Sequence, residues 1–217
     1  ASAPSSPATI STSPTRTAVP SVTVAAVGDL CFDSAPGRLI RAQGGAAPLS
    51  AVASRLKSAD VTVGNLECPL STRGAPVAGK TYTFRGDPRA TAGLVSAGFD
   101  LVSLANNHAR DYGPLALLDT FANLRKAGIA WAGAGVDRTA AWRPAIVASG
   151  GARVAYLAFS EITPANFVAT GSSPGTAYTY DIAKVCAAIR AAHARADYVI
   201  VAFHWGIERR YTPTSRK

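Results

Sequence analysis

Four short segments of the chain carry side chains that could bind a metal ion. The residues are Asp29, Asn65 and Glu67, the consecutive Asn106, Asn107 and His108, and His204. Carboxylate and amide oxygens suit hard divalent cations, whereas imidazole suits zinc, iron and manganese. A site that combined them and stayed open to water would lower the pKa of a bound water molecule. A neighbouring His could protonate a leaving group, so the set favours hydrolysis of a phosphate ester or an amide.

Each segment also has a structural interpretation when it is taken alone. Gly-Asp after a strand is most often a turn, Asn65 can cap a helix or turn, and Glu67 can be an exposed charge. His204 precedes a tryptophan and can be a hydrogen-bonded core histidine. The chain has no P-loop and no GxGxxG motif, and Ser160 does not lie in a G-x-S-x-G elbow. His193 lies among alanines of a predicted helix, which suggests no chemical role.

Short apolar runs precede the polar segments and predict the strands that must position them. The predicted strands cover residues 22–27, 61–70, 100–105, 129–135 and 197–206, with a hairpin around Gly150-Gly151. Residues 80–86 alternate like a half-exposed strand. The polar residues fall at the ends of the strands, and the strand interiors carry almost none. This distribution is the main sign of function in the sequence.

Helices are predicted between these strands. They cover residues 47–60, 87–99, 113–128 and 181–196. Asp87 and Asp181 suit N-cap positions, Pro88 suits a first helical position, and Gly128 suits a C-cap. Alternation of buried strands and helices predicts an α/β fold around a largely parallel or mixed sheet. Ligands of such folds bind beyond the carboxyl ends of the strands, so the polar side chains should meet there.

The composition suits one folded domain with an anionic partner. The chain has 217 residues, which is enough for a single sizeable core, and no continuous apolar stretch of transmembrane length. Its formal net charge of +9 suits phosphate, a polyanionic polymer, a membrane surface or nucleic acid. Because Lys and Arg are scattered and no nucleic-acid-binding motif occurs, we expect no nucleic acid partner.

The N-terminal segment and the cysteines leave alternatives open. Residues 1–21 are rich in Ser, Thr and Pro and predict a disordered linker, with the folded domain over residues 22–217. Such linkers are common after a secretion signal, between membrane or cell wall and domain, although the tail of an intracellular protein would look the same. Cys31 and Cys68 both follow strand-like runs and could form a disulfide, or they and Cys186 could all stay reduced.

Five segments together resemble a known family. "AAVGDL", "VGNLECPL", "KTYTFRGDP", "LVSLANNHARDYG" and "VAFHWGIE" occur in the order seen in the CapA family, the capsule-synthesis proteins of poly-gamma-glutamate assembly. That family is similar to the calcineurin-like metallophosphoesterases. The resemblance covers the chain from Val22 onward. It implies a layered α/β/β/α sandwich of the metallophosphoesterase type and a divalent metal such as Mn, Fe or Zn.

The resemblance also assigns roles to individual residues. It implies metal ligands at Asp29, Glu67, Asn107 and His204, a general acid at His108, and substrate contacts at Asn65, Lys80, Arg85 and Asn106. Two departures accompany it. The Asp-x-His pair of metallophosphoesterases is Asp29-Leu30-Cys31 here, so one imidazole is missing. A later segment resembling Gly-His-x-Pro-His is also missing, which predicts a truncated chain and an incomplete metal site.

The expected function follows from the resemblance and the charge. We expect an exported, cell-surface protein of poly-gamma-glutamate biosynthesis or processing, with a metal-dependent hydrolase-like site. The expected partner is an anionic polymer or a phosphate-like substrate. One alternative is a non-catalytic structural or polymer-binding subunit of a membrane synthase complex, tethered by the linker. Another is a metallophosphoesterase acting on small phosphate esters, against which the missing Asp-x-His pair argues.

Overall fold

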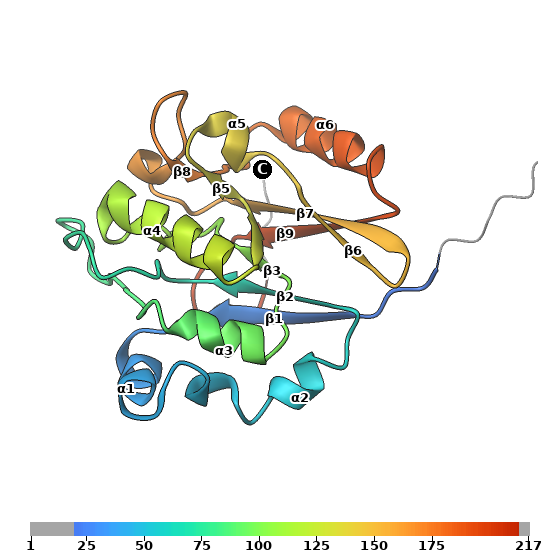
Figure 1. Ribbon diagram of the computed structural model, residues 1–217. Helices are drawn as coiled ribbons and strands as arrows, with labels where there is room; N and C mark the ends of the chain where they lie inside the picture. The colour runs from blue at the N-terminus through green and yellow to red at the C-terminus, as the bar shows by residue number, and fades with distance from the viewer. Residues whose placement is uncertain (1–19, 213–217) are drawn as a thin grey trace, which may run out of the picture.

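Figure 1 shows the computed structural model of the chain, which describes residues 20–212. Apart from Pro20 and Ser21, the predicted linker of residues 1–21 lies outside the described residues and stays a prediction. Within the described range, no helix is both long enough and apolar enough to cross a membrane.

The first sheet is parallel and begins the domain. Its strands, in the order β1-β2-β3-β4, are β1 (Val24–Leu30), β2 (Val61–Leu66), β3 (Leu101–Ser103) and β4 (Ala130–Ala132). The helices that alternate with them are α1 (Ser34–Gln43), α2 (Ala53–Leu56), α3 (Ala90–Ser96) and α4 (Gly113–Lys126). All three strand pairs are parallel, so their carboxyl ends lie at one edge of the sheet.

The second sheet is mixed. A hairpin around Gly150-Gly151 joins β6 (Ala145–Ser149) to β7 (Ala152–Ser160), and β9 (Tyr198–His204) adds in parallel to β7. The remaining elements are β5 (Ala134–Gly135), β8 (Gly175–Thr176), α5 (Arg138–Ala141) and α6 (Ile182–His193). Figure 1 shows β1, β2 and β9 all pointing to the same side of the molecule. The predicted hairpin and the helix capped by Asp181 are confirmed.

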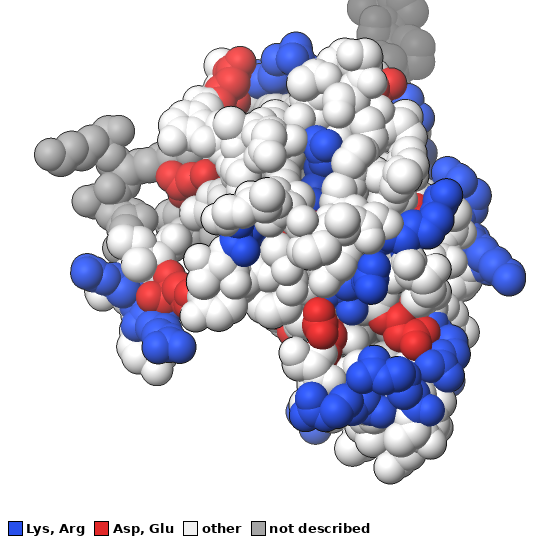
Figure 2. All heavy atoms as spheres, turned by 90° about the vertical axis from the view of Figure 1, so that its left-hand side faces the viewer, with Lys and Arg blue, Asp and Glu red and all other residues white. Residues whose placement is uncertain are grey.

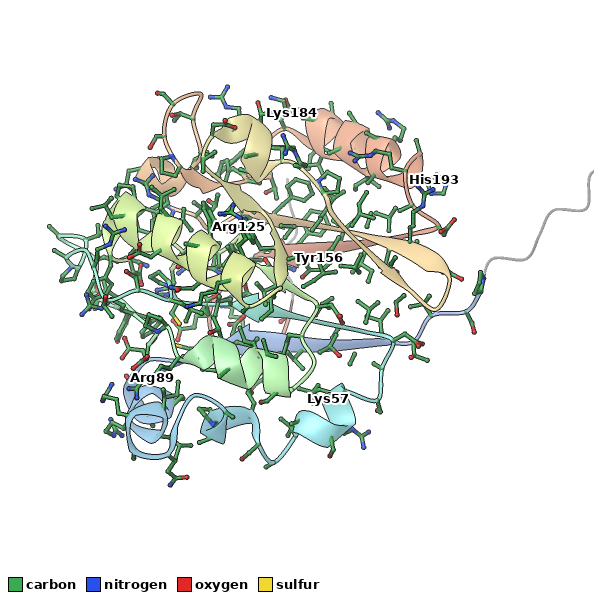
Figure 3. The ribbon with its side chains drawn as sticks, viewed as in Figure 1. Lys57, Arg89, Arg125, Tyr156, Lys184 and His193 are labelled. Carbon is green, nitrogen blue, oxygen red and sulfur yellow. The ribbon has the colours of Figure 1, made fainter. Side chains whose placement is uncertain are left out.

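Three apolar clusters hold the layers together. One lies between the first sheet and α1, α3 and α4, and another lies between the second sheet and α5 and α6. The third joins the two sheets, where Val63 and Leu101 pack with Val154 and Tyr156. Figure 3 shows Tyr156 in this interior. The layers therefore run helix, sheet, sheet, helix, and the predicted α/β class and α/β/β/α order are confirmed.

The predicted strand at residues 80–86 is wrong. Only an isolated bridge joins Gly86 to Leu70, and the segment is otherwise irregular. Its groups bond to carboxylates of other segments instead of to a strand: the Lys80 ammonium and the Phe84 N–H both contact Asp111. The alternation of polar and apolar residues in this segment therefore reflects hydrogen bonds to buried carboxylates and not the two faces of a pleated sheet.

Two helix predictions need correction as well. The helix expected at residues 47–60 is divided into a 3-10 turn (Ala47–Leu49) and the four-residue α2, because the Ser50 hydroxyl bonds back to Ala47 and closes a turn. The segment before it was expected as a loop but forms α1, which begins after Asp33. The helix predicted from residue 87 begins at Ala90 instead, since the Asp87 side chain accepts a bond from the Arg89 N–H.

Candidate metal centre

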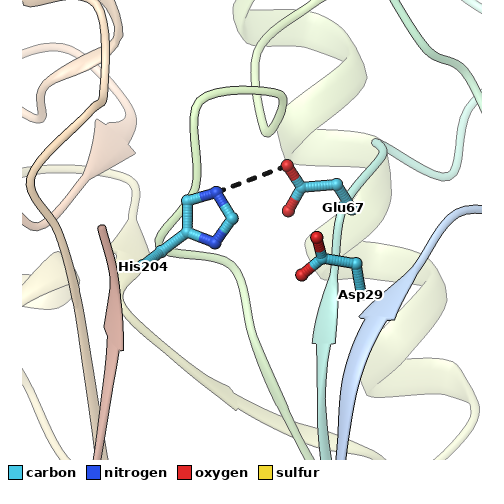
Figure 4. Close-up of side chains that lie close together, drawn as sticks. All are labelled: Asp29, Glu67 and His204. Atoms are coloured by element: carbon cyan, nitrogen blue, oxygen red, sulfur yellow. Dashed lines mark ion pairs between the residues drawn. The ribbon is translucent and has the colours of Figure 1, made fainter. Parts of the chain in front are cut away.

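Three strand ends from two sheets bring the candidate ligands together. Asp29 lies in β1 and pairs in register with Asn65 of β2, while Glu67 follows the end of β2. His204 is the last residue of β9 and comes from the facing sheet. The predicted meeting of polar side chains at the strand ends is therefore observed for Asp29, Glu67 and His204 (Figure 4).

The geometry of these three side chains matches a metal-binding triad. One ligand atom from each of Asp29, Glu67 and His204 can be chosen so that all lie within 4.8 Å of one another. His204 Nε2 lies 3.5 Å from Glu67 Oε1. Asp29 is exposed, His204 is half-buried and Glu67 is buried, so the site is open on the Asp29 side. Access from solvent is what a hydrolytic metal site needs, because substrate and water must both enter.

Asn107 adds a fourth group to the triad. Its Oδ1 lies 3.0 Å from His204 Nε2, on the same side of the imidazole as Glu67. An amide oxygen only accepts hydrogen bonds, so the neutral His204 carries its proton on Nε2 here. A cation that bound the imidazole and the amide oxygen would replace this hydrogen bond. All four predicted ligands thus converge.

Asn65 and Asn106 orient the two carboxylates through hydrogen bonds. The His108 N–H donates to Asn106 Oδ1 at 3.0 Å, and Asn106 Nδ2 donates to Leu66 O at 2.8 Å, which fixes the orientation of this amide. Asn106 Nδ2 also donates to Asn65 Oδ1, so Asn65 Nδ2 must face the two carboxylates. It lies 2.7 Å from Asp29 Oδ1 and 2.5 Å from Glu67 Oε2. Both amides are used within the protein, and their contact with a substrate stays a prediction.

Burial changes the pKa of two of the candidate ligands. Burial raises the pKa of the Glu67 carboxyl to about 8, and the negative charge of Asp29 adds to this effect. Burial also lowers the pKa of His204, so its imidazole is neutral near pH 7 and has a lone pair for a metal. Two converging acids and a neutral imidazole form a site that lacks positive charge.

A divalent cation fits this donor set. Among residues 20–212, no Lys or Arg forms an ion pair with Asp29 or Glu67. Carboxylate, imidazole and amide oxygen together suit first-row divalent metals. A cation would neutralise the carboxylates and make ionised Glu67 favourable. Cys31, at which the resemblance implied a missing imidazole, is not part of the cluster of possible ligands in the described residues.

His108 is held beside the triad by a buried network. Its Nδ1 lies 2.5 Å from Asp111 Oδ2, and its ring lies against Phe84 with centroids 4.4 Å apart. Lys80 forms an ion pair with Asp111 and donates to Asn107 O at 2.6 Å. The other ring nitrogen, Nε2, lies 4.0 Å from Glu67 Oε1 and so faces the triad. The network thus directs Nε2 of His108 toward the triad.

Asp111 is the important residue that our sequence reasoning did not assign. It is fully buried and bonds to His108, Lys80 and the Phe84 N–H. Its position three residues after His108, in the same polar segment, was the available signal. Lys80 was predicted to face an anionic substrate, but its ammonium group bonds within the protein. Its contact with a substrate stays a prediction.

Arg85 lies outside this network. Its guanidinium lies 4.3 Å above the ring of Tyr112, and its Nη1 is 3.5 Å from Arg73 O and 3.4 Å from Gly74 O. Figure 2 shows the face at which the strands end, where Lys and Arg side chains gather in the lower part with fewer Asp and Glu. This basic surface would favour an anionic ligand. The role predicted for Arg85 stays a prediction.

The cysteines are all free in the structure, so the disulfide alternative is not realised in it. Cys31 and Cys68 nevertheless hydrogen-bond to each other, which lowers the pKa of Cys31 to about 7 and raises that of Cys68. Cys186 lies on α6, away from this pair. His193 is at the end of the same helix, far from the strand ends (Figure 3).

Comparisons with known proteins connect this site to one family. Residues 23–217 match the model of the family described as "Bacterial capsule synthesis protein PGA_cap". The chain is 27% identical to the capsule biosynthesis protein CapA of Bacillus anthracis over 202 residues, which are 90% of this chain and 49% of that protein. The PGA biosynthesis protein CapA of Bacillus subtilis is 26% identical over 193 residues, 88% of this chain and 50% of that protein.

A third relative is more similar over a shorter stretch. The probable polyglutamine synthesis accessory protein of Mycobacterium tuberculosis is 34% identical over 157 residues, 68% of this chain and 41% of that protein. The chain thus spans about half the length of the curated relatives that it matches, or less. The family model includes every strand end that supplies a candidate ligand. The chain therefore belongs to the family of bacterial capsule synthesis proteins.

Proposed function

We propose that the chain forms a metal-dependent hydrolase-like domain of a protein that acts in poly-gamma-glutamate synthesis or processing. The observation that carries the proposal is the convergence of Asp29, Glu67 and His204 at the ends of strands from two sheets. The Bacillus subtilis relative is named as a PGA biosynthesis protein, which supports this polymer, and the net charge of +9 suits a polyanion. Export and a place at the cell surface belong to the same proposal.

The residues of the site would divide the chemistry between them. Asp29, Glu67, Asn107 and His204 would hold a divalent ion such as Mn, Fe or Zn, which would supply a Lewis acid and an activated water. Asn65 would keep the two carboxylates oriented, since its amide donates to both. His108 would give a proton from Nε2 to the leaving group, while Asp111 holds Nδ1. The substrate class is an amide or a phosphate ester.

A non-catalytic role has one observation in its favour. Cys31, for which the resemblance implies the place of an imidazole ligand, lies outside the cluster of possible ligands in the described residues. A site with one ligand fewer could bind the polymer or a metal without turnover, as a subunit of a membrane synthase complex. Metal binding and polymer cleavage therefore need separate tests.

Metal titration tests the site directly. Chelator-treated protein would be titrated with Mn²⁺, Zn²⁺ and Fe²⁺, the last without oxygen, beside the His204→Ala and His193→Ala variants. We expect one ion per wild-type chain, a loss of at least tenfold in affinity for His204→Ala, and no change for His193→Ala, whose imidazole is remote. Equal affinity in all three proteins, or no binding to the wild type, would overturn the metal site.

Turnover is the second measurement. The metal-loaded wild type would be incubated with poly-gamma-glutamate and with p-nitrophenyl phosphate, and new amine ends or nitrophenolate would be counted. The hydrolase proposal expects new amine ends in the polymer, and their loss in His108→Gln with the metal still bound. Metal binding without cleavage of either substrate would support the non-catalytic role instead.

A further inference from the structure

Two thiols meet beside the candidate ligands. Cys31 follows the end of β1, and Cys68 comes two residues after the end of β2. The strands are in register at Leu30 and Leu66, and the Glu67 N–H donates to Leu30 O at 3.0 Å. The two cysteine side chains hydrogen-bond to one another. We infer that Cys31 and Cys68 are a reversible dithiol–disulfide pair whose oxidation alters the metal centre.

The backbone geometry permits the bond. From the pairing of Leu30 with Leu66, Cys31 and Cys68 are offset by one residue across neighbouring strands. Such strands lie about 4.8 Å apart and rise about 3.3 Å per residue, so a one-residue offset stays within the roughly 4.4–6.8 Å between Cα atoms that a disulfide needs. The two thiols are already in hydrogen-bond contact, so the bond requires that the sulfur atoms approach to about 2.05 Å. The Phe32 N–H donates to Cys68 Sγ at 3.3 Å and fixes the inner thiol. Little rearrangement of the core is therefore needed.

Unequal burial sets the order of the reaction. Cys68 is fully buried, whereas Cys31 is half-buried. A small disulfide such as oxidised glutathione can reach only Cys31, so the Cys31 thiolate attacks it and one glutathione thiolate leaves. Cys68 then loses its proton and attacks the Cys31 sulfur, and the second glutathione thiolate leaves. Two protein thiols are oxidised, one glutathione disulfide is reduced to two thiols, and the two protons go to the leaving thiolates.

The bond would act on the candidate ligands through the strand ends. Asp29 is two residues before Cys31, and Glu67 is directly before Cys68. Contraction of the sulfur pair draws the ends of β1 and β2 together and displaces both carboxylates from their positions around Asn65. We expect the oxidised protein to bind the metal at least threefold more weakly. This part of the inference rests on the proposed metal site, whereas the disulfide itself does not.

Mass spectrometry and thiol counting test the pair in the whole chain. After treatment with oxidised glutathione and removal of the reagent, we expect the wild type to lose two of its three thiols and to yield a Cys31–Cys68 cross-linked peptide. Cys186→Ser should form the same cross-link. Cys68→Ser should stop at a stable glutathione adduct on Cys31, and Cys31→Ser should keep Cys68 unmodified. Dithiothreitol should restore all thiols of the wild type.

The outcomes separate this inference from the proposed function. A lasting glutathione adduct on wild-type Cys31, or a cross-link through Cys186, would overturn the pair even if the metal titration succeeds. A Cys31–Cys68 disulfide in a chain that binds no metal would leave the pair standing and remove the metal site. Equal metal affinity of the reduced and oxidised wild type would overturn the coupling between them. Cys31→Ser is the control, because its metal affinity should not respond to oxidised glutathione.

Discussion

At the scale of single residues, replacement of Asp111 should cost the protein the most stability. Its carboxylate is fully buried and neutralises Lys80, whose side chain is 18% exposed. Asp111→Asn would leave the Lys80 charge without its anion in a poorly solvated place, so we expect a loss of about 3 kcal/mol in the free energy of unfolding. Urea denaturation with an unchanged m-value would measure it.

Asp119→Asn is the matched control for Asp111. Asp119 also pairs with a basic residue, but the side chain of that partner, Arg73, is 60% exposed and solvated. We expect this variant to lose much less stability, because exposed ion pairs contribute little. An equal loss of stability in the two variants would contradict the argument that burial makes the Asp111 ion pair the more important one.

Glu67 gives the metal-free protein a specific pH dependence. Its pKa is raised to about 8 by burial and by Asp29, against an ordinary value of 4.5. Between these values the folded state keeps a proton that the unfolded state has lost, so the stability due to this group falls as the pH rises from 5 to 8. The loss should be on the order of a few kcal/mol.

The Glu67→Gln variant isolates this effect. Chelator-treated wild type and variant would be unfolded in urea from pH 5 to pH 8, and the difference between them followed. His204 has a lowered pKa and contributes with the opposite sign, but it is present in both proteins. A difference between the wild type and Glu67→Gln that stayed constant over this range would show that Glu67 is already ionised.

The residue types of the site could be read from the sequence, but their bonding could not. Asp29, Glu67, Asn107 and His204 follow apolar runs and were implied as ligands by the resemblance, and they do converge. The hydrogen bonds by which Asn65 and Asn106 orient the carboxylates depend on which way each side-chain amide points. That orientation is set by the His108 N–H and by Leu66 O, which adjoin them only in the folded chain. Hydrogen-bond partners distant in sequence leave no local pattern.

At the scale of elements, two glycines make a matched test of how β1 and β2 position the site. A Cβ on Gly64 of β2 would lie 2.7 Å from Val27 Cγ2, 2.9 Å from Leu30 Cδ1 and 3.0 Å from Phe99 Cε1. A Cβ on Gly28 of β1 would meet nothing within 4 Å. We expect Gly64→Ala to cost about 1–3 kcal/mol of stability through overpacking, and Gly28→Ala to be tolerated.

The same pair of variants tests metal binding. Because Gly64 directly precedes Asn65, overpacking there should displace the amide that orients Asp29 and Glu67. Metal affinity should therefore fall in Gly64→Ala and stay unchanged in Gly28→Ala, as measured by titration of both folded variants. A stable Gly64→Ala protein with full affinity would show that β2 is less rigid than the contacts indicate.

The elements themselves were predictable where local signals agreed with tertiary contacts. β2, β7 and β9 are runs rich in β-branched and apolar residues, and α4 and α6 have clear apolar faces. α1 was missed because Pro36 and Gly37 near its start resemble a loop. Residues 80–86 misled the prediction because their polar members are anchored to Asp111 and not to solvent. Tertiary anchoring overrode the local pattern in that case.

At the scale of the whole molecule, the candidate centre joins the two sheets. Asp29 and Glu67 come from the first sheet and His204 from the second, so a bound ion would connect both halves of the sandwich. An ion that binds only the folded state adds about 2.7 kcal/mol of stability at 100 times its dissociation constant. We expect Mn²⁺ or Zn²⁺ to raise the melting temperature of the wild type but not that of His204→Ala. An equal rise in both proteins would show that the ion binds elsewhere.

The charge of the whole molecule predicts how it should meet a polymer. The net charge of +9 and the basic part of the face in Figure 2 should attract poly-gamma-glutamate, with an affinity that falls as salt screens the charges.

Dextran sulfate of equal charge is the control, because a purely electrostatic surface would bind both polymers alike. Titrations at 50 and 300 mM NaCl would separate the contributions. We expect poly-gamma-glutamate binding to persist at the higher salt in the wild type and to weaken in Arg85→Gln, since the guanidinium of Arg85 was predicted to contact the polymer. Identical salt-sensitive binding of both polymers would instead leave the charge as a general feature of the surface and remove the polymer from the proposed function.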